Sequence, residues 1–123
     1  MKKLLLLLLF IPLVSFGQLT YEEKNTIAAE IFETFNKNYI KESALEFLRL
    51  DDKAIAMAQK KYSNPKDWEA QIDYQREIEN QDRLAWYKKQ NWWKKINKNE
   101  SIAFYVRAKI VGYAYDQGWY DGL

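Results

Sequence analysis

The segment 86–95 gathers the residue types best suited to binding chemistry in this chain. Its indole rings alternate with ammonium groups, and its candidate ligand-binding residues are Trp86, Lys88, Lys89, Trp92, Trp93, Lys94 and Lys95. Such a segment can seat a helix on an anionic membrane surface, and its rings can stack on sugars. The same pattern is typical of a helix whose tryptophans face the core while its lysines face solvent. We favour the core interpretation and keep glycan or anionic-lipid binding by segment 86–95 as the alternative.

A row of polar side chains precedes this segment at steps of four, three and seven residues: Gln75, Glu79, Asp82 and Lys89. Two carboxylates one helical turn apart can bind a hard cation or act as an acid–base pair. They are equally compatible with a half-buried polar seam in which Asp82 pairs with a basic residue of a neighbouring helix. We expect the seam.

The chain contains neither histidine nor cysteine. This absence excludes disulfides, the usual zinc and copper sites, Ser-His-Asp and Cys-His catalysis, and covalently attached haem. We therefore expect a protein that is not an enzyme and that needs no metal or cofactor.

Apolar residues at three- and four-residue steps predict helices that must position these side chains. The first begins at a capping box, Thr20 to Glu23, and its apolar stripe continues to Tyr39. Three further helices are expected over residues 40–62, 65–96 and 101–120, with a candidate break in the third at Gln90–Asn91.

The last of these stretches also alternates in a manner typical of a strand, from Ile102 to Val111. We prefer a helix, because a single strand would have no partner in the chain. The sequence therefore predicts an all-α fold, a small antiparallel bundle of three to four helices. The alternative is an α+β fold with residues 101–115 as a strand.

The first seventeen residues have the layout of a secretory signal peptide: Lys2 and Lys3, an apolar run over 4–14, then Ser15-Phe16-Gly17. The apolar run is too short to cross a bilayer, which takes about 20 residues. We expect cleavage before Gln18, a periplasmic or secreted product, and one helical domain over residues 18–123.

Charge is unevenly distributed along the expected mature chain. Two of the 19 basic residues lie in the signal segment, which leaves 17 basic against 17 acidic residues and a net charge of zero. Residues 18–82 carry 9 basic and 14 acidic residues, whereas residues 83–109 carry 8 basic and 1 acidic. We expect these charges to be satisfied largely inside the molecule, and we expect no nucleic-acid partner.

These observations favour an exported helical domain that binds another envelope protein. It would act as an immunity protein or inhibitor, or as a chaperone. Support comes from the small size, the absence of catalytic residue types and the 16% aromatic content, since aromatic side chains are preferred interface anchors. The sequence leaves the partner and the oligomeric state open.

Overall fold

The computed structural model describes residues 19–122. The expected signal peptide, residues 1–17, lies outside the described residues and stays a prediction. The described part contains helices and no strand, which confirms the all-α class. The helices are α2 (Tyr21–Glu33), α3 (Lys37–Lys61), α4 (Trp68–Lys88), α5 (Trp92–Lys95) and α6 (Glu100–Asp116), with a 3-10 turn η3 (Pro65–Asp67) before α4.

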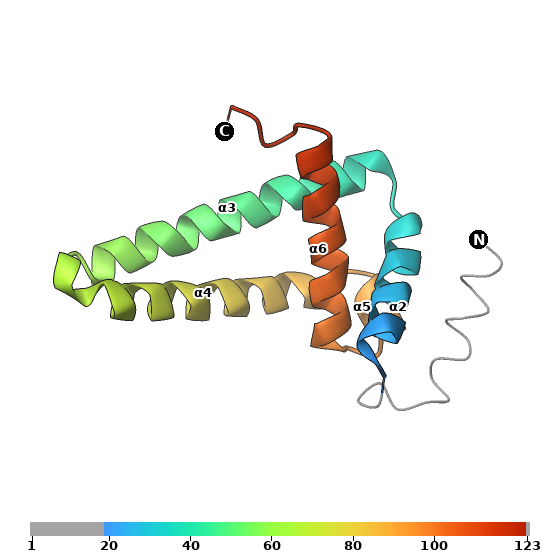
Figure 1. The fold of residues 1–123 in the computed structure, drawn as a ribbon, viewed down its shortest axis with the longest axis horizontal. Helices are drawn as coiled ribbons and strands as arrows, with labels where there is room; N and C mark the ends of the chain where they lie inside the picture. Colours follow the sequence, from blue (N-terminus) through green and yellow to red (C-terminus); the bar gives the residue numbers. More distant parts are fainter. Residues whose placement is uncertain (1–18, 123) are drawn as a thin grey trace.

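The arrangement of these five helices differs from the expected antiparallel bundle of three to four. α3 and α4 pack along each other as an antiparallel hairpin, and α2 and α6 lie side by side across its root (Figure 1). α2 and α6 run in the same direction, because the hairpin returns the chain to the end at which α2 begins. The outer part of the hairpin projects past α6 (Figure 1), and we call its residues 52–78 the arm.

Side-chain caps divide the chain into helices more finely than the apolar periodicity predicts. Asn36 Oδ1 accepts a hydrogen bond from the Tyr39 backbone N–H at 2.8 Å and so begins α3. The first predicted helix is therefore two helices, and Tyr39 belongs to the second. The predicted capping box is confirmed, since Thr20 and Glu23 each accept from the other's backbone N–H.

The third predicted helix is interrupted where the sequence places its candidate break. α4 ends at Lys88, and α5 starts at Trp92. The Trp86 carbonyl near the end of α4 accepts from the Lys89 backbone N–H at 3.1 Å and also from Gln90 Nε2 at 2.9 Å. The chain can turn a corner here without burying unpaired backbone groups.

The last stretch is helix α6, so the strand alternative for residues 101–115 is wrong. Its buried residues recur at steps of four, which is the helical repeat: Ile102, Val106, Ile110 and Ala114. Asn99 caps this helix, with its Oδ1 accepting from the Ile102 backbone N–H at 3.0 Å. The two preceding residues, Asn97 and Lys98, have φ of 54° and 55°, in the left-handed region.

The hydrophobic core lies where α2, α5 and α6 meet the root of the hairpin. Its largest fully buried side chains are Phe47, Ile31, Ile96, Ile102, Ile110 and Val106. The arm has a much thinner interior, formed mainly by Ala54, Ala58 and Ile78 at its inner end. These residues lie outside the main core cluster. The fold thus consists of a well-packed head and a slender projection.

Candidate functional site

Segment 86–95 forms the corner between α4 and α5, at the edge of the head. The indoles of Trp92 and Trp93 are only 4% and 6% exposed, and Trp86 is half-buried. Lys88, Lys89, Lys94 and Lys95 are all exposed. The rings therefore serve the core while the lysines face solvent, as in the interpretation favoured from the sequence. Insertion of these indoles into a lipid surface would require the core to open.

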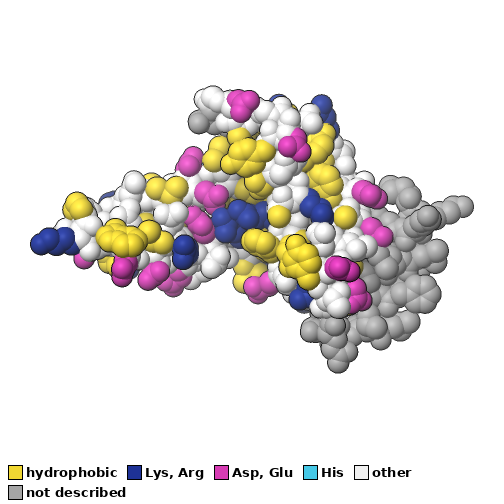
Figure 2. Space-filling model, viewed as in Figure 1, with side chains coloured by type: hydrophobic (Ala, Val, Ile, Leu, Met, Phe, Trp, Pro, Cys, Tyr) yellow, Lys and Arg dark blue, Asp and Glu magenta, His cyan; other side chains and the backbone are white. Residues whose placement is uncertain are grey.

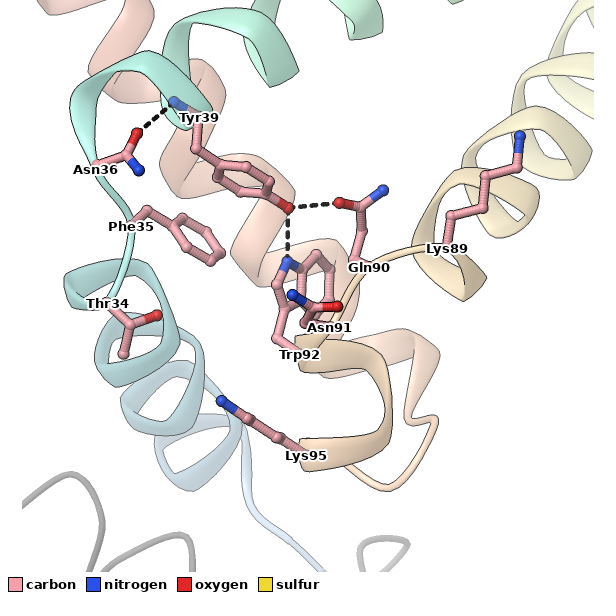
Figure 3. A pocket seen from close by; sticks show the side chains of 9 residues that line it. All are labelled: Thr34, Phe35, Asn36, Tyr39, Lys89, Gln90, Asn91, Trp92 and Lys95. Carbon is pink, nitrogen blue, oxygen red and sulfur yellow. Dashed lines mark hydrogen bonds between the residues drawn. The ribbon is translucent and has the colours of Figure 1, made fainter.

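A hydrogen-bonded hub holds this corner against α3. The Tyr39 hydroxyl accepts from Trp92 Nε1 at 2.9 Å and donates to Gln90 Oε1 at 2.7 Å (Figure 3). Its ring packs on Phe35, with the two ring centroids 4.6 Å apart. A tyrosine hydroxyl is protonated at neutral pH and can donate, and burial raises the pKa of Tyr39 further above its ordinary value. The hub fixes Trp92 and Gln90 in place.

A cavity of about 420 Å³ opens beside this hub. The connection between α2 and α3 supplies one wall with Thr34, Phe35 and Asn36, and the corner supplies the other with Lys89, Gln90 and Asn91. Tyr39, Trp92 and Lys95 complete the lining (Figure 3). Three of the seven candidate residues thus line one cavity: Lys89, Trp92 and Lys95. The other four, Trp86, Lys88, Trp93 and Lys94, do not.

The α2–α3 wall of this cavity was not predicted from the sequence. Tyr39 and Gln90 are 51 residues apart, and no local pattern connects them. The only available signal is the Asn36 cap, which places a turn and two aromatic rings at the start of α3.

The polar row becomes a set of ion pairs at the root of the arm, as the seam interpretation predicts. Asp82 lies 3.5 Å from the Lys53 ammonium group, and Glu79 lies 3.3 Å from the Arg83 guanidinium group. Arg83 also reaches Asp51 of α3 at 3.0 Å. Both carboxylates therefore carry a cationic partner that holds α3 against α4. Within residues 19–122 there is no group of three or more acidic side chains that could hold a metal ion.

A further hollow of about 290 Å³ lies between α3 and α6. Arg107 enters it with its guanidinium carbon 5.5 Å from the centroid of the Phe47 ring, and Asp51 and Tyr115 contribute to the lining. Burial lowers the pKa of Arg107, although a guanidinium group keeps its charge at neutral pH. Its contact with the Phe47 ring is of the cation–π type and fastens α6 to the root of the hairpin.

The arm carries exposed apolar side chains. Trp68 is 57% exposed, Met57 40% and Ile72 37%. Figure 2 shows hydrophobic side chains gathered towards the end of the arm and basic ones at its extremity. Both Trp68 and Ile72 lie in the stretch 65–96, whose apolar spacing predicts a helix with one face towards the core. Trp68 and Ile72 are exposed because the hairpin extends beyond α2 and α6, so the side chains of the head do not cover them.

Comparisons with protein-family models, curated proteins and solved structures find no match to this chain. No helix among residues 19–122 has the length and apolar character needed to span a membrane.

Proposed function

We propose that this protein is an exported, non-enzymatic binding module whose arm docks onto another envelope protein. The observation that carries the proposal is the exposure of Trp68 on the projecting arm. Tryptophan is on average a highly buried residue, and it is enriched among the residues that dominate binding energy at interfaces. Ile72 lies one turn further along α4, on the same face, and provides a second anchor at the spacing used when a helix enters a groove.

The shape of the arm supports insertion rather than flat contact. From Asp52 to Lys61, α3 adds about 15 Å beyond the root at 1.5 Å per residue. Lys60 and Lys61 close this helix, and Lys66 follows in η3. The matching partner has an apolar cleft whose rim carries both charges, because Asp67 and Glu69 flank Trp68 while the lysines lie at the tip. If the protein is an immunity protein or inhibitor, its one target has such a cleft. If it is a chaperone, many client proteins present comparable apolar surfaces to the arm.

The non-enzymatic part of the proposal draws support from the ion pairs of Glu79 and Asp82. Both carboxylates are engaged in ion pairs within the hairpin, and neither lines either of the two cavities described above. Replacing both residues by their amides is expected to weaken the root of the arm, and we expect no catalytic turnover to be lost.

The test uses the full chain with a C-terminal tag, expressed in its source cells and captured at moderate salt. Trp68→Ala and Ile72→Ala should each abolish capture of the partner, and the matched control Tyr115→Ala should not. Tyr115 is 68% exposed but lies on α6, away from the arm. A partner that all three variants retain equally would refute docking by the arm.

The number of partners then distinguishes the two modes of action. One stoichiometric partner that depends on Trp68 would support an immunity or inhibitor role. A diffuse set of clients with the same dependence would support a chaperone role.

A further inference from the structure

The side of α6 that faces away from the core is apolar. Phe104 is 50% exposed and Tyr115 is 68% exposed, and the small residues Ala108 and Gly112 between them are exposed as well. At 100° per residue these four positions fall within about 80° of one another, with the charged residues of α6 to either side. In Figures 1 and 2 α6 lies in front of the hairpin, so this face is open to solvent. A helix that is apolar all round is normally buried, which makes this face a candidate interface.

Aromatic rings cluster at both ends of the face. At one end the centroid of the Phe104 ring lies 5.9 Å from that of Tyr105, which lies 5.2 Å from that of the exposed Tyr21. At the other end the ring centroids of Tyr115 and Tyr120 are 5.1 Å apart. Aromatic side chains are preferred interface anchors, so both ends of the face suit contact with a protein.

The middle of the face allows another helix to approach closely. Among the described residues, no atom of another element lies within 4 Å of the position that a Cβ would take at Gly112. Glycine inside a helix is destabilising relative to alanine, and the packing of the monomer does not require so small a residue here. Small residues at a crossing point let two helices approach, and larger side chains further along fill the widening gap between them.

The order of residues along this face is the same in both directions: aromatic, small, small, aromatic. Phe104 and Tyr115 lie about 8 Å to either side of their midpoint at 1.5 Å per residue, and the two small residues lie about 3 Å to either side of nearly the same point. An antiparallel second α6 therefore places its Tyr115 on Phe104 and its Gly112 on Ala108. A twofold axis repeats both contacts. The expected mature chain carries 17 basic and 17 acidic residues, so two copies have no net repulsion.

We propose that the protein forms a twofold-symmetric dimer in which two α6 helices pack antiparallel about Ala108 and Gly112. One helix face per copy makes an interface at the small end of the specific range, below about 1,200 Å², so the expected Kd is on the order of 10–100 µM. The twofold axis of such a pair runs across α6, as the hairpin does in Figure 1, so both arms project to the same side of the dimer. The dimer does not rest on docking by the arm, and either can fail alone.

The test is sedimentation equilibrium of the full chain at concentrations that span the expected Kd. Gly112→Leu places a large side chain at the crossing point and should weaken dimerisation about tenfold or more. The monomer has room for this side chain, and leucine is a better helix former than glycine, so circular dichroism should show an intact fold. Ala85→Leu, at an exposed position of α4, is the matched control and should leave the Kd unchanged. A chain that stays monomeric throughout, or a Gly112→Leu variant that dimerises as tightly as the unmodified chain, would overturn the proposal.

Cross-linking tests the antiparallel arrangement. The chain contains no cysteine, so an introduced thiol reports only on its own surroundings. A Phe104→Cys copy mixed with a Tyr115→Cys copy should be joined by a short bifunctional maleimide, because the two positions face each other. Neither variant should cross-link with itself, since its two thiols would lie about 17 Å apart along the helix axes. Cross-linking of either variant with itself, or none in the mixture, would overturn the arrangement.

Discussion

Replacing Tyr39 by phenylalanine tests whether the hub holds the corner against α3. The change removes one oxygen atom and keeps the ring, so the contact with Phe35 is preserved. Two hydrogen bonds are lost, to Trp92 Nε1 and to Gln90 Oε1. The half-buried Gln90 can turn towards water, whereas the Trp92 N–H belongs to a side chain that is only 4% exposed.

The expected cost follows from this difference between the two partners. A hydrogen bond of ordinary strength contributes about 1 kcal/mol net, and a buried donor left without an acceptor costs about 1–3 kcal/mol. We therefore expect Tyr39→Phe to lower the free energy of unfolding by about 2 kcal/mol, which corresponds to a fall in Tm of roughly 10 °C for a domain of this size.

Urea unfolding followed by tryptophan fluorescence and far-ultraviolet circular dichroism measures this loss, provided the m-value is unchanged. The matched control is Tyr115→Phe, because the Tyr115 ring is 68% exposed and its hydroxyl makes no hydrogen bond within residues 19–122. It should change stability by less than about 0.5 kcal/mol, the usual range for a surface substitution. An equally small effect of Tyr39→Phe would refute the structural role of the hub.

Three further predictions concern other parts of the chain. Burial raises the pKa of Tyr39, Tyr87 and Tyr120 above the ordinary value of 10.0, so the folded state holds these phenolic protons more tightly than the unfolded state. The resulting stabilisation is complete below pH 10.0 and is lost as the pH rises through the folded-state pKa values. Urea midpoints should therefore fall at alkaline pH, and less steeply in Tyr87→Phe than in the unmodified protein. Lys98→Gly should raise the free energy of unfolding by up to about 1 kcal/mol, because glycine adopts the left-handed conformation of this residue without steric cost. A thermal melt measures the change, and a lower Tm for Lys98→Gly would contradict this explanation. Amino-terminal sequencing of the protein recovered from the cell envelope should begin at Gln18, and an intact Met1 would contradict cleavage.

The helices could be predicted wherever a local signal agrees with the packing. The Thr20 cap and the break at Gln90–Asn91 are each visible in the sequence, and each is present in the structure. Helix α6 was preferred over a strand because a single strand would have no partner in the chain, and the structure confirms the helix. The pairing of Asp82 with a basic residue of a neighbouring helix could also be predicted, because a carboxylate on an apolar stripe needs a cationic partner when it is half-buried.

The architecture and the cavity could not be predicted in the same way. The apolar stripe of α4 gives no indication that Trp68 and Ile72 lie beyond the reach of α6, since periodicity defines a face but not what covers it. The cavity depends on Tyr39 meeting Gln90 across 51 residues of chain, a tertiary contact without a sequence signature. For the same reason, the tryptophans of segment 86–95 could be assigned to the core or to the surface only once the fold was known.

The thin interior of the arm has a consequence for its local stability. Ala54, Ala58 and Ile78 bury little apolar area compared with the head, and a segment with few buried contacts opens at a free energy well below that of global unfolding. Backbone amides of residues 55–74 should therefore exchange with solvent much faster than those of α6, while the head remains intact. A partner that clamps the arm would slow this exchange and would lose part of its binding energy in ordering the hairpin. The arm can thus adjust its shape to a cleft, and hydrogen exchange can report its occupancy.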